Sequence, residues 1–160
     1  STNRYVLVSV SAPWCGWCQK MKREVYPSAP VQQCLARYYV VTRINPDAEN
    51  RTYTYRDRRV GPGRLTALLG GDGGIPGTII LSPSGDSLVQ LSGYLESQML
   101  ADVLAYVGTG AHRRASFRSY RTSAPAGCPT RSRIQGDASA TMRDSLFFPR
   151  SGKAIRSSGG

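Results

Sequence analysis

The sequence has little of what would place it in a specialised structural class. Its longest mainly apolar stretch, Tyr5–Val10, is far shorter than the roughly 20 residues of a membrane-spanning helix. Four cysteines in 160 residues are too few for a small disulfide scaffold. No signal peptide is visible, but the chain starts with Ser1 rather than methionine. We therefore expect a processed or trimmed N-terminus, and the missing signal gives no information about the compartment.

Acidic residues are also scarce, and their shortage is uneven along the chain. The 21 Lys and Arg residues outnumber the 10 Asp and Glu residues, which gives a formal net charge of +11. Residues 1–110 carry 11 basic and 8 acidic side chains, whereas residues 111–160 carry 10 and 2. A basic protein often binds nucleic acid or an anionic surface. Here that expectation applies to the last third of the chain only.

The hydrophobic pattern predicts alternating strands and helices through residue 108. We expect strands at 5–12, 38–45, 78–81 and 87–93, and helices at 16–26, 28–39, 65–71 and 95–108. Residues 45–64 are polar and interrupted by glycine, which favours a long loop, and residues 111–122 could form one more short helix. After Ser123 the apolar periodicity stops, and Ser, Arg, Gly and Pro dominate.

This order of elements predicts a small α/β sandwich with a mixed central sheet flanked by helices. A strand, a helical crossover and a parallel strand come first, and a hairpin with a packing helix follows. We expect one folded domain at 1–122 and a disordered, basic, low-complexity tail at 123–160.

Two cysteines separated by two residues, in "SAPWCGWCQK", are the strongest chemical signal in the chain. A C-x-x-C motif beside a βαβ pattern indicates redox chemistry. Cys15 falls at the start of the predicted helix, where unpaired N–H groups and the helix dipole stabilise a thiolate. We expect its side chain to point outward. Cys18 lies one turn further in, on the face of Met21 and Val25, and is expected to be the resolving thiol.

The motif has two alternative uses, a metal site and a structural disulfide. A structural zinc ion needs four ligands, and the chain offers only Cys34, His112 and Cys128, scattered and unpaired, as further candidates. A purely structural disulfide at this spacing would close a very short loop and add little stability. We therefore expect no metal at the motif.

At these residues the chain resembles the thioredoxin superfamily. "VLVSVSAPWCGWCQKMKREV" resembles its first core strand, active-site turn and long helix, and "GGIPGTIILSPSGDSLVQLSGY" resembles its later hairpin. The match covers residues 5–107. Within the superfamily, "WCGWCQKMKREVYPSAPVQQCLARYYVVTRIN" looks most like the exported branch. That branch includes the thioredoxins associated with sulfur oxidation and the C-terminal domain of the electron transporter for periplasmic disulfide reduction.

The resemblance to the sulfur-oxidation thioredoxins continues to about Tyr120. The extra N-terminal strand and helix of the full thioredoxin fold have no counterpart here, and truncation is the simplest explanation.

The resemblance implies a cis Ile75–Pro76 peptide bond across from Cys15, with the backbone of Ile75 available to pair with an extended substrate. The alternative is that Pro76 simply begins a strand. Trp14 is expected to line the substrate groove, although an aromatic residue at this position could equally belong to the core.

The active-site turn departs from the family pattern in two ways. Gly16 and Trp17 stand between the cysteines, where thioredoxins usually carry Gly-Pro; we expect both to border the groove, with Trp17 exposed. Ser9 stands where thioredoxins usually bury an aspartate that moves protons. Proton transfer to Cys18 would therefore depend on water or another group.

From these residues we expect a thiol–disulfide oxidoreductase that reduces protein disulfides and needs no cofactor beyond the Cys15–Cys18 dithiol. The resemblance implies a membrane or soluble electron donor and a periplasmic or otherwise exported location, with a cytoplasmic location as the alternative. A disulfide-donating oxidase differs only in redox potential. A rival hypothesis is a non-catalytic binding module whose basic tail contacts nucleic acid or an anionic surface.

The other two cysteines carry weaker expectations. Cys34 falls on an apolar helix face and is predicted to be a small, buried, free cysteine, with a regulatory role as the alternative. Cys128, in "APAGCPT", is expected to be exposed, and either incidental or intermolecularly bonded. Basic and aromatic residues alternate in the 45–64 loop, a pattern that can stack on bases. A solvated loop is the preferred interpretation, because no nucleic-acid-binding fold accompanies them.

Overall fold

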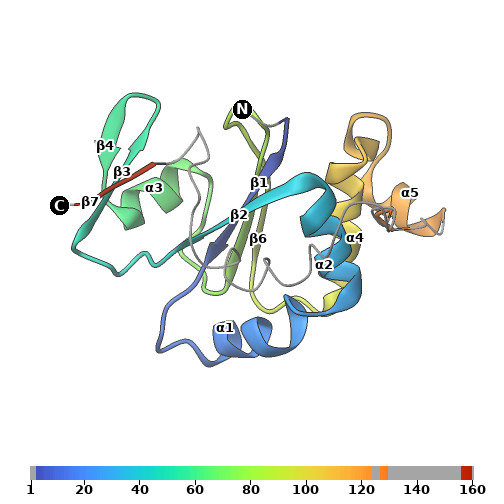
Figure 1. Ribbon diagram of the computed structural model, residues 1–160, viewed down its shortest axis with the longest axis horizontal. Helices are drawn as coiled ribbons and strands as arrows, with labels where there is room; N and C mark the ends of the chain where they lie inside the picture. The colour runs from blue at the N-terminus through green and yellow to red at the C-terminus, as the bar shows by residue number, and fades with distance from the viewer. Residues whose placement is uncertain (1–2, 124–126, 130–155, 160) are drawn as a thin grey trace.

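A four-stranded mixed sheet lies at the centre of the computed structural model, which describes residues 3–123, 127–129 and 156–159 (Figure 1). Its strands are β1 (Tyr5–Val10), β2 (Tyr39–Ile44), β5 (Gly77–Leu81) and β6 (Ser87–Ser92), in the order β2-β1-β5-β6. Strand β1 pairs parallel with β2 and antiparallel with β5, which pairs antiparallel with β6. The predicted mixed α/β fold class is confirmed.

Strand β1 is central, and its composition explains why. All six of its residues are buried, as in strands that are covered on both faces. Successive side chains point to opposite faces, so Leu7 and Val8 enter two different cores. Leu7 packs with the helices on one side, and Val8 packs against Leu65 and Leu69 on the other.

The helices cover the two faces unequally (Figure 1). On one face lie α1 (Gly16–Lys20), its continuation as a π-helical turn η1 (Met21–Val25), α2 (Ala29–Tyr38) and α4 (Ser97–Gly108); on the other lies α3 (Pro62–Leu68). Helices α2 and α4 meet closely, because a Cβ at Gly108 would lie 2.6 Å from the Tyr38 ring. No helix within the described residues is long and apolar enough to cross a membrane.

The long loop predicted at 45–64 is wrong, because the segment contains a β-hairpin. It is formed by β3 (Arg51–Tyr55) and β4 (Arg58–Val60), which pair antiparallel. Arg56 and Asp57 make the two-residue turn with positive φ angles of 49° and 63°, the conformation that suits hairpin twist. The alternating tyrosines Tyr53 and Tyr55 point into the core and are buried, so they are not an exposed stacking platform.

Beyond α4 the chain forms two short helical elements, η2 (Ala111–Arg113) and α5 (Phe117–Thr122). Within the predicted tail, β7 (Arg156–Gly159) pairs antiparallel with β3. Residues 124–126, 130–155 and 160 lie outside the described residues, so the prediction for most of the tail is not addressed.

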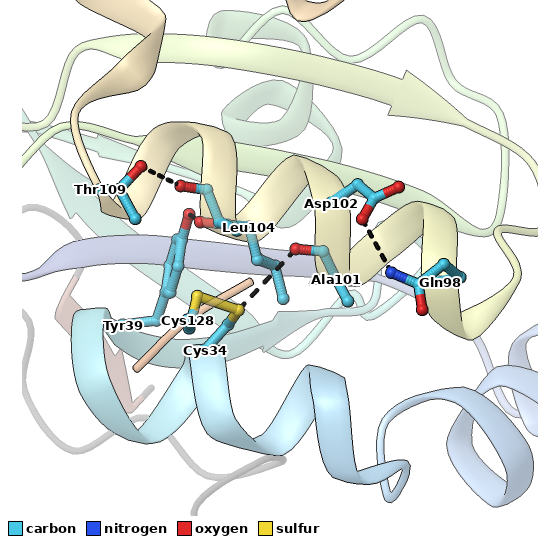
Figure 2. Close-up of a disulfide and its surroundings, with 9 residues drawn as sticks. Cys34, Tyr39, Gln98, Ala101, Asp102, Leu104, Thr109 and Cys128 are labelled. Atoms are coloured by element: carbon cyan, nitrogen blue, oxygen red, sulfur yellow. Dashed lines mark hydrogen bonds between the residues drawn. A yellow bond between two sulfur atoms is a disulfide. The ribbon is translucent and has the colours of Figure 1, made fainter. Parts of the chain in front are cut away.

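A second disulfide, Cys34–Cys128, corrects two expectations (Figure 2). Cys34 is buried as predicted, but it is not free, and Cys128 is 6% exposed rather than solvent-facing. The sulfur of Cys34 lies 3.8 Å from the carbonyl oxygen of Ala101 on α4, and Tyr39 donates to the carbonyl of Leu104 nearby. The error arose because the bonded partners are 94 residues apart, a separation across which local patterns say nothing.

Candidate active site

The C-x-x-C motif lies where β1 ends and α1 begins, and its cysteines form a disulfide. After β1, Ser11 donates its N–H to Ile44 on β2, and Cys15 donates its N–H to Ala12 to close a turn. Cys15 is then the N-cap of α1, in an extended conformation that starts the helix at Gly16. The Cys18 N–H, which has no partner within the first helical turn, points at the Cys15 sulfur at 3.2 Å.

Both sulfur-bearing residues are nearly covered. Cys15 is 5% and Cys18 is 6% exposed, so the expectation that Cys15 points outward is wrong for this oxidised state. The reason is local: the disulfide holds Cys15 back over the first turn of α1, where it also accepts the Cys18 N–H.

Two exposed tryptophans stand next to the cysteines in the chain: Trp14 precedes Cys15 and Trp17 precedes Cys18. Trp14 is 70% and Trp17 is 58% exposed, the highest values for large hydrophobic residues in the described part of the chain. The Trp14 indole donates to the Asp47 carboxylate at 2.9 Å. Exposed aromatic side chains beside a reactive group are typical of protein-binding surfaces. The groove role predicted for Trp14 and Trp17 stays a prediction, but a place for Trp14 in the core is excluded by its exposure.

Trp17 is held by neighbours from two elements. Its ring lies 5.3 Å from the Tyr94 ring, which follows β6. The Lys20 ammonium lies 5.4 Å from the Trp17 ring centre and 5.0 Å from that of Tyr94. Gly16 is exposed, and a Cβ there would meet nothing within 4 Å.

The segment opposite the motif precedes β5. The Ile75–Pro76 peptide bond is cis, the isomer that the resemblance implies. The Pro76 carbonyl accepts the Gly93 N–H at 2.7 Å, and Pro76 shares a small cavity with Cys18. Pairing of the Ile75 backbone with a substrate stays a prediction.

Ser9, which stands where the resemblance implies a buried aspartate, is 7% exposed and lines the same cavity as Cys18. Burial raises the pKa of Tyr26, which also lines this cavity, and the hydroxyls of Ser9 and Thr78 offset part of that rise.

Sequence reasoning missed Tyr26, Asp47 and Tyr94 as site residues. They reach the motif only through tertiary structure, and no local pattern marks them.

The thiols that a zinc ion would need are joined in pairs in this oxidised structure, and the expectation of no metal stays a prediction. The described cysteines all lie in the two disulfides. Within residues 3–123, 127–129 and 156–159, no three His, Cys, Asp or Glu side chains gather closely enough to hold a metal ion.

Comparison with known proteins places these features in a family context. A family model described as a thioredoxin-like domain matches residues 1–108. No curated protein matches the chain.

Solved structures resemble the fold at low sequence identity. A thioredoxin-fold protein from Helicobacter pylori aligns with a TM-score of 0.65 at 13% identity, over 76% of this chain and 84% of that one. A thioredoxin from Thermus thermophilus aligns with a TM-score of 0.53 at 21% identity, over 69% and 80%. The oxidised C-terminal domain of Neisseria meningitidis DsbD gives 0.45 at 16% identity, over 66% and 79%.

Proposed function

We propose that this chain, which belongs to the thioredoxin-like domain family and is a thiol–disulfide oxidoreductase, reduces protein disulfides through Cys15. The observation that carries the proposal is the Cys15–Cys18 disulfide at the N-terminus of α1, with the exposed Trp14 and Trp17 next to its cysteines in the chain and with Pro76, of the cis Ile75–Pro76 bond, in the same cavity as Cys18.

In the reduced protein, Cys15 is the nucleophile. A thiolate attacks a disulfide, whereas a thiol does not. As the N-cap of α1, the Cys15 sulfur faces unpaired N–H groups and the positive end of the helix dipole, which both favour the thiolate. Its attack forms a Cys15–substrate disulfide and breaks the substrate's own disulfide. The electron pair of that bond leaves on the second substrate sulfur, which takes up a proton.

Cys18 completes the reaction. Its sulfur attacks Cys15, re-forms the Cys15–Cys18 bond and releases the first substrate sulfur as a thiol. The protein ends oxidised, in the form that the structure shows. A dithiol donor, either a membrane protein or a soluble one, must then reduce it for the next cycle.

The exposed tryptophans give the substrate a place to bind. An extended segment lying between Trp14 and Trp17 would bring its sulfur over Cys15 and its backbone alongside Ile75. Such strand-like pairing supplies affinity from the main chain, so the substrate sequence can vary.

An exported location is part of the same proposal. The buried Cys34–Cys128 disulfide supports it, because such bonds persist in oxidising compartments and are rare in the reducing cytoplasm. The proposed substrate is therefore a disulfide-bearing exported protein.

The test is a redox titration of the full chain in defined ratios of oxidised and reduced dithiothreitol. Fluorescence of Trp14 and Trp17 reports the neighbouring disulfide, and alkylation with peptide mapping shows which cysteine pair opens at each ratio. We expect a reversible two-electron transition of Cys15–Cys18 near ~−270 mV, the value of thioredoxin. A value near ~−120 mV would indicate a disulfide donor and overturn the reducing direction. No reversible transition would overturn the redox function itself.

A further inference from the structure

A row of polar side chains crosses the central sheet beneath the active-site helix. Ser9 on β1 is paired with Arg43 on β2 and with Thr78 on β5. Side chains alternate along a strand, so Ser9 lies on the same face as Leu7, which packs with η1, α2 and α4. The row therefore lies on the face that carries Cys18, within a sheet whose core residues are otherwise mainly apolar.

A small cavity separates this row from the helix. Its volume is about 10 Å³, close to the smallest space that holds one water molecule. Cys18 and Tyr26 line it from the helix side, and Ser9, Ser11 and Arg43 line it from the sheet. The charged residues in its described lining are Arg43 and Lys22, and none of the lining residues is acidic. The Arg43 Nε donates to the Ser11 hydroxyl at 2.8 Å, which fixes the guanidinium at the edge of the cavity.

The hydroxyl of Tyr26 is buried beside those of Ser9 and Thr78, which lower its pKa, but none of its contacts with the described residues has full hydrogen-bond geometry, and the same holds for the Thr78 hydroxyl. Tyr26 is only 4% exposed. Leaving a buried polar group unpaired is costly, so such groups in a folded protein need an explanation. A water in the adjoining cavity would supply the missing partner and connect the phenol to the Cys18 sulfur.

We propose that this cavity is the proton path of Cys18: its thiol proton passes through a cavity water to the Tyr26 and Ser9 hydroxyls, while Arg43 stabilises the thiolate. The inference rests on the proposed function and deepens it, because it identifies the groups that serve the second half of the exchange. A carboxylate is not needed when hydroxyls relay the proton and a fixed cation lowers the energy of the anion.

The proton and electron balance is complete within this scheme. The Cys18 S–H bond breaks, and its proton moves along the hydroxyls to solvent; each hydroxyl accepts one proton and donates one, so it ends unchanged. The Cys18 thiolate then attacks the Cys15 sulfur. The Cys15–substrate bond breaks with its electron pair on the substrate sulfur, which takes a proton from solvent. Cys15 and Cys18 are oxidised, and the substrate disulfide is reduced.

The test is a stopped-flow reaction of the full chain with 5,5′-dithiobis(2-nitrobenzoate), after reduction of Cys15–Cys18 alone has been verified by peptide mapping. The first equivalent of coloured thiolate reports attack by Cys15, and the second reports attack by Cys18. Tyr26→Phe removes only the hydroxyl of the proposed path. Tyr39→Phe is the matched control, because its buried hydroxyl donates to Leu104 at 2.8 Å and does not line the cavity.

We expect Tyr26→Phe to slow the second phase roughly tenfold near neutral pH, a modest value for proton-transfer catalysis, and to leave the first phase unchanged. The difference should disappear at high pH, where the Cys18 thiol is already ionised. Tyr39→Phe should leave both phases unchanged. A second phase at the wild-type rate, or one slowed equally at every pH, would overturn the proton path and leave the proposed function standing.

Arg43→Gln tests the electrostatic part and serves if Tyr26→Phe does not fold. It keeps a hydrogen-bond donor for Ser11 but removes the charge, so the pH profile of the second phase should move to higher pH. An unmoved profile would overturn the role of Arg43. If the wild-type chain shows neither phase, the proposed function itself fails, and this inference fails with it.

Discussion

The chain contains two disulfides that are almost equally buried and yet have different surroundings. The four cysteines are between 1% and 6% exposed. The Cys15–Cys18 bond joins residues three positions apart, whereas the Cys34–Cys128 bond joins residues 94 positions apart. Burial of the sulfur atoms therefore does not separate a reactive disulfide from a structural one.

The neighbours of each disulfide make the distinction. Cys15 sits at a helix N-terminus between two exposed tryptophans, a site where a thiolate is stabilised and a partner protein can bind. Cys34 and Cys128 lie in the core between α2 and α4, beside Ala101 and among aliphatic and aromatic side chains (Figure 2). Apolar surroundings disfavour a thiolate. We therefore assign exchange chemistry to the first pair and stability to the second.

The largest expected effect comes from replacing the nucleophile. Cys15→Ser should lower the rate of protein-disulfide reduction, driven by dithiothreitol, by about 10³-fold or more, because no thiolate remains at the start of α1. The matched control is the double variant Cys34→Ala/Cys128→Ala, which should retain most of the exchange rate. Substantial activity in Cys15→Ser, or its loss in the control, would reverse the assignment of the two pairs.

For stability we expect the opposite order: the Cys34–Cys128 disulfide should contribute more to the free energy of unfolding than the Cys15–Cys18 disulfide. By the loop-closure relation, the bond across 94 residues restricts the unfolded chain by about 4–5 kcal/mol, and the bond across three residues by about 2 kcal/mol. Cys34→Ala/Cys128→Ala should therefore lower the free energy of unfolding more than Cys15→Ala/Cys18→Ala does. Urea denaturation of both double variants, without reductant, measures this difference. Equal losses would show that Cys34–Cys128 is not the stabilising bond.

Local sequence patterns were sufficient for the central elements of the fold. The valine-rich run at β1 and the apolar stripe of α4 have periodicities that identify them without tertiary information. Likewise, the C-x-x-C motif needs only the helix that follows it for its chemistry to be recognised.

Most of the features that the sequence did not reveal depend on long-range contacts. Cys128 meets Cys34 only after the chain has passed through α4 and α5. The β3–β4 hairpin was missed because Arg56, at the first position of its turn, adopts a positive-φ conformation that usually favours Asn, Asp or Gly. Tyr26 gives no sequence signal as a site residue, since its role follows from the pairing of Ser9 with Thr78 across β1 and β5.

A smaller effect is expected from the surface beside Cys15. Trp17→Ala removes a ring that contacts Tyr94 and lies beneath the Lys20 ammonium, so it removes part of the proposed binding face. We expect the KM for a protein disulfide to rise roughly 3- to 10-fold, as one aromatic contact is worth about 0.5–1.5 kcal/mol. The potential of Cys15–Cys18 should stay the same.

Leu88→Ala is the control for that variant, because it removes an exposed apolar side chain from β6. Its steady-state kinetics should match those of the wild type. An unchanged KM in Trp17→Ala would place substrate binding elsewhere, whereas a changed potential would mean that Trp17 acts on the sulfur chemistry.

The smallest effect concerns the loop that places Ile75–Pro76 opposite the active-site disulfide. Asp72 accepts hydrogen bonds from the Ser92 hydroxyl at 2.6 Å and the Gly74 N–H at 2.8 Å, and these bonds lower the pKa of its carboxyl group. Because this pKa is lowered in the folded protein, the ionised Asp72 carboxylate stabilises the folded state at pH values above its ordinary pKa of 3.8. That contribution is lost as the pH falls through the lowered pKa.

Asp72→Asn should therefore weaken the loss of stability on acidification, which urea midpoints measured below pH 5 would show. It should also slow disulfide exchange slightly at neutral pH. Asp86→Asn is the matched control. Ser84 and Arg56 lower the pKa of Asp86, so its acid limb should flatten as well. However, Asp86 lies in the turn between β5 and β6, which is not the turn that precedes Pro76, so exchange should not change. Equal rates of disulfide exchange in the two variants would show that Asp72 is not needed to hold the loop before Pro76 in position for exchange at Cys15.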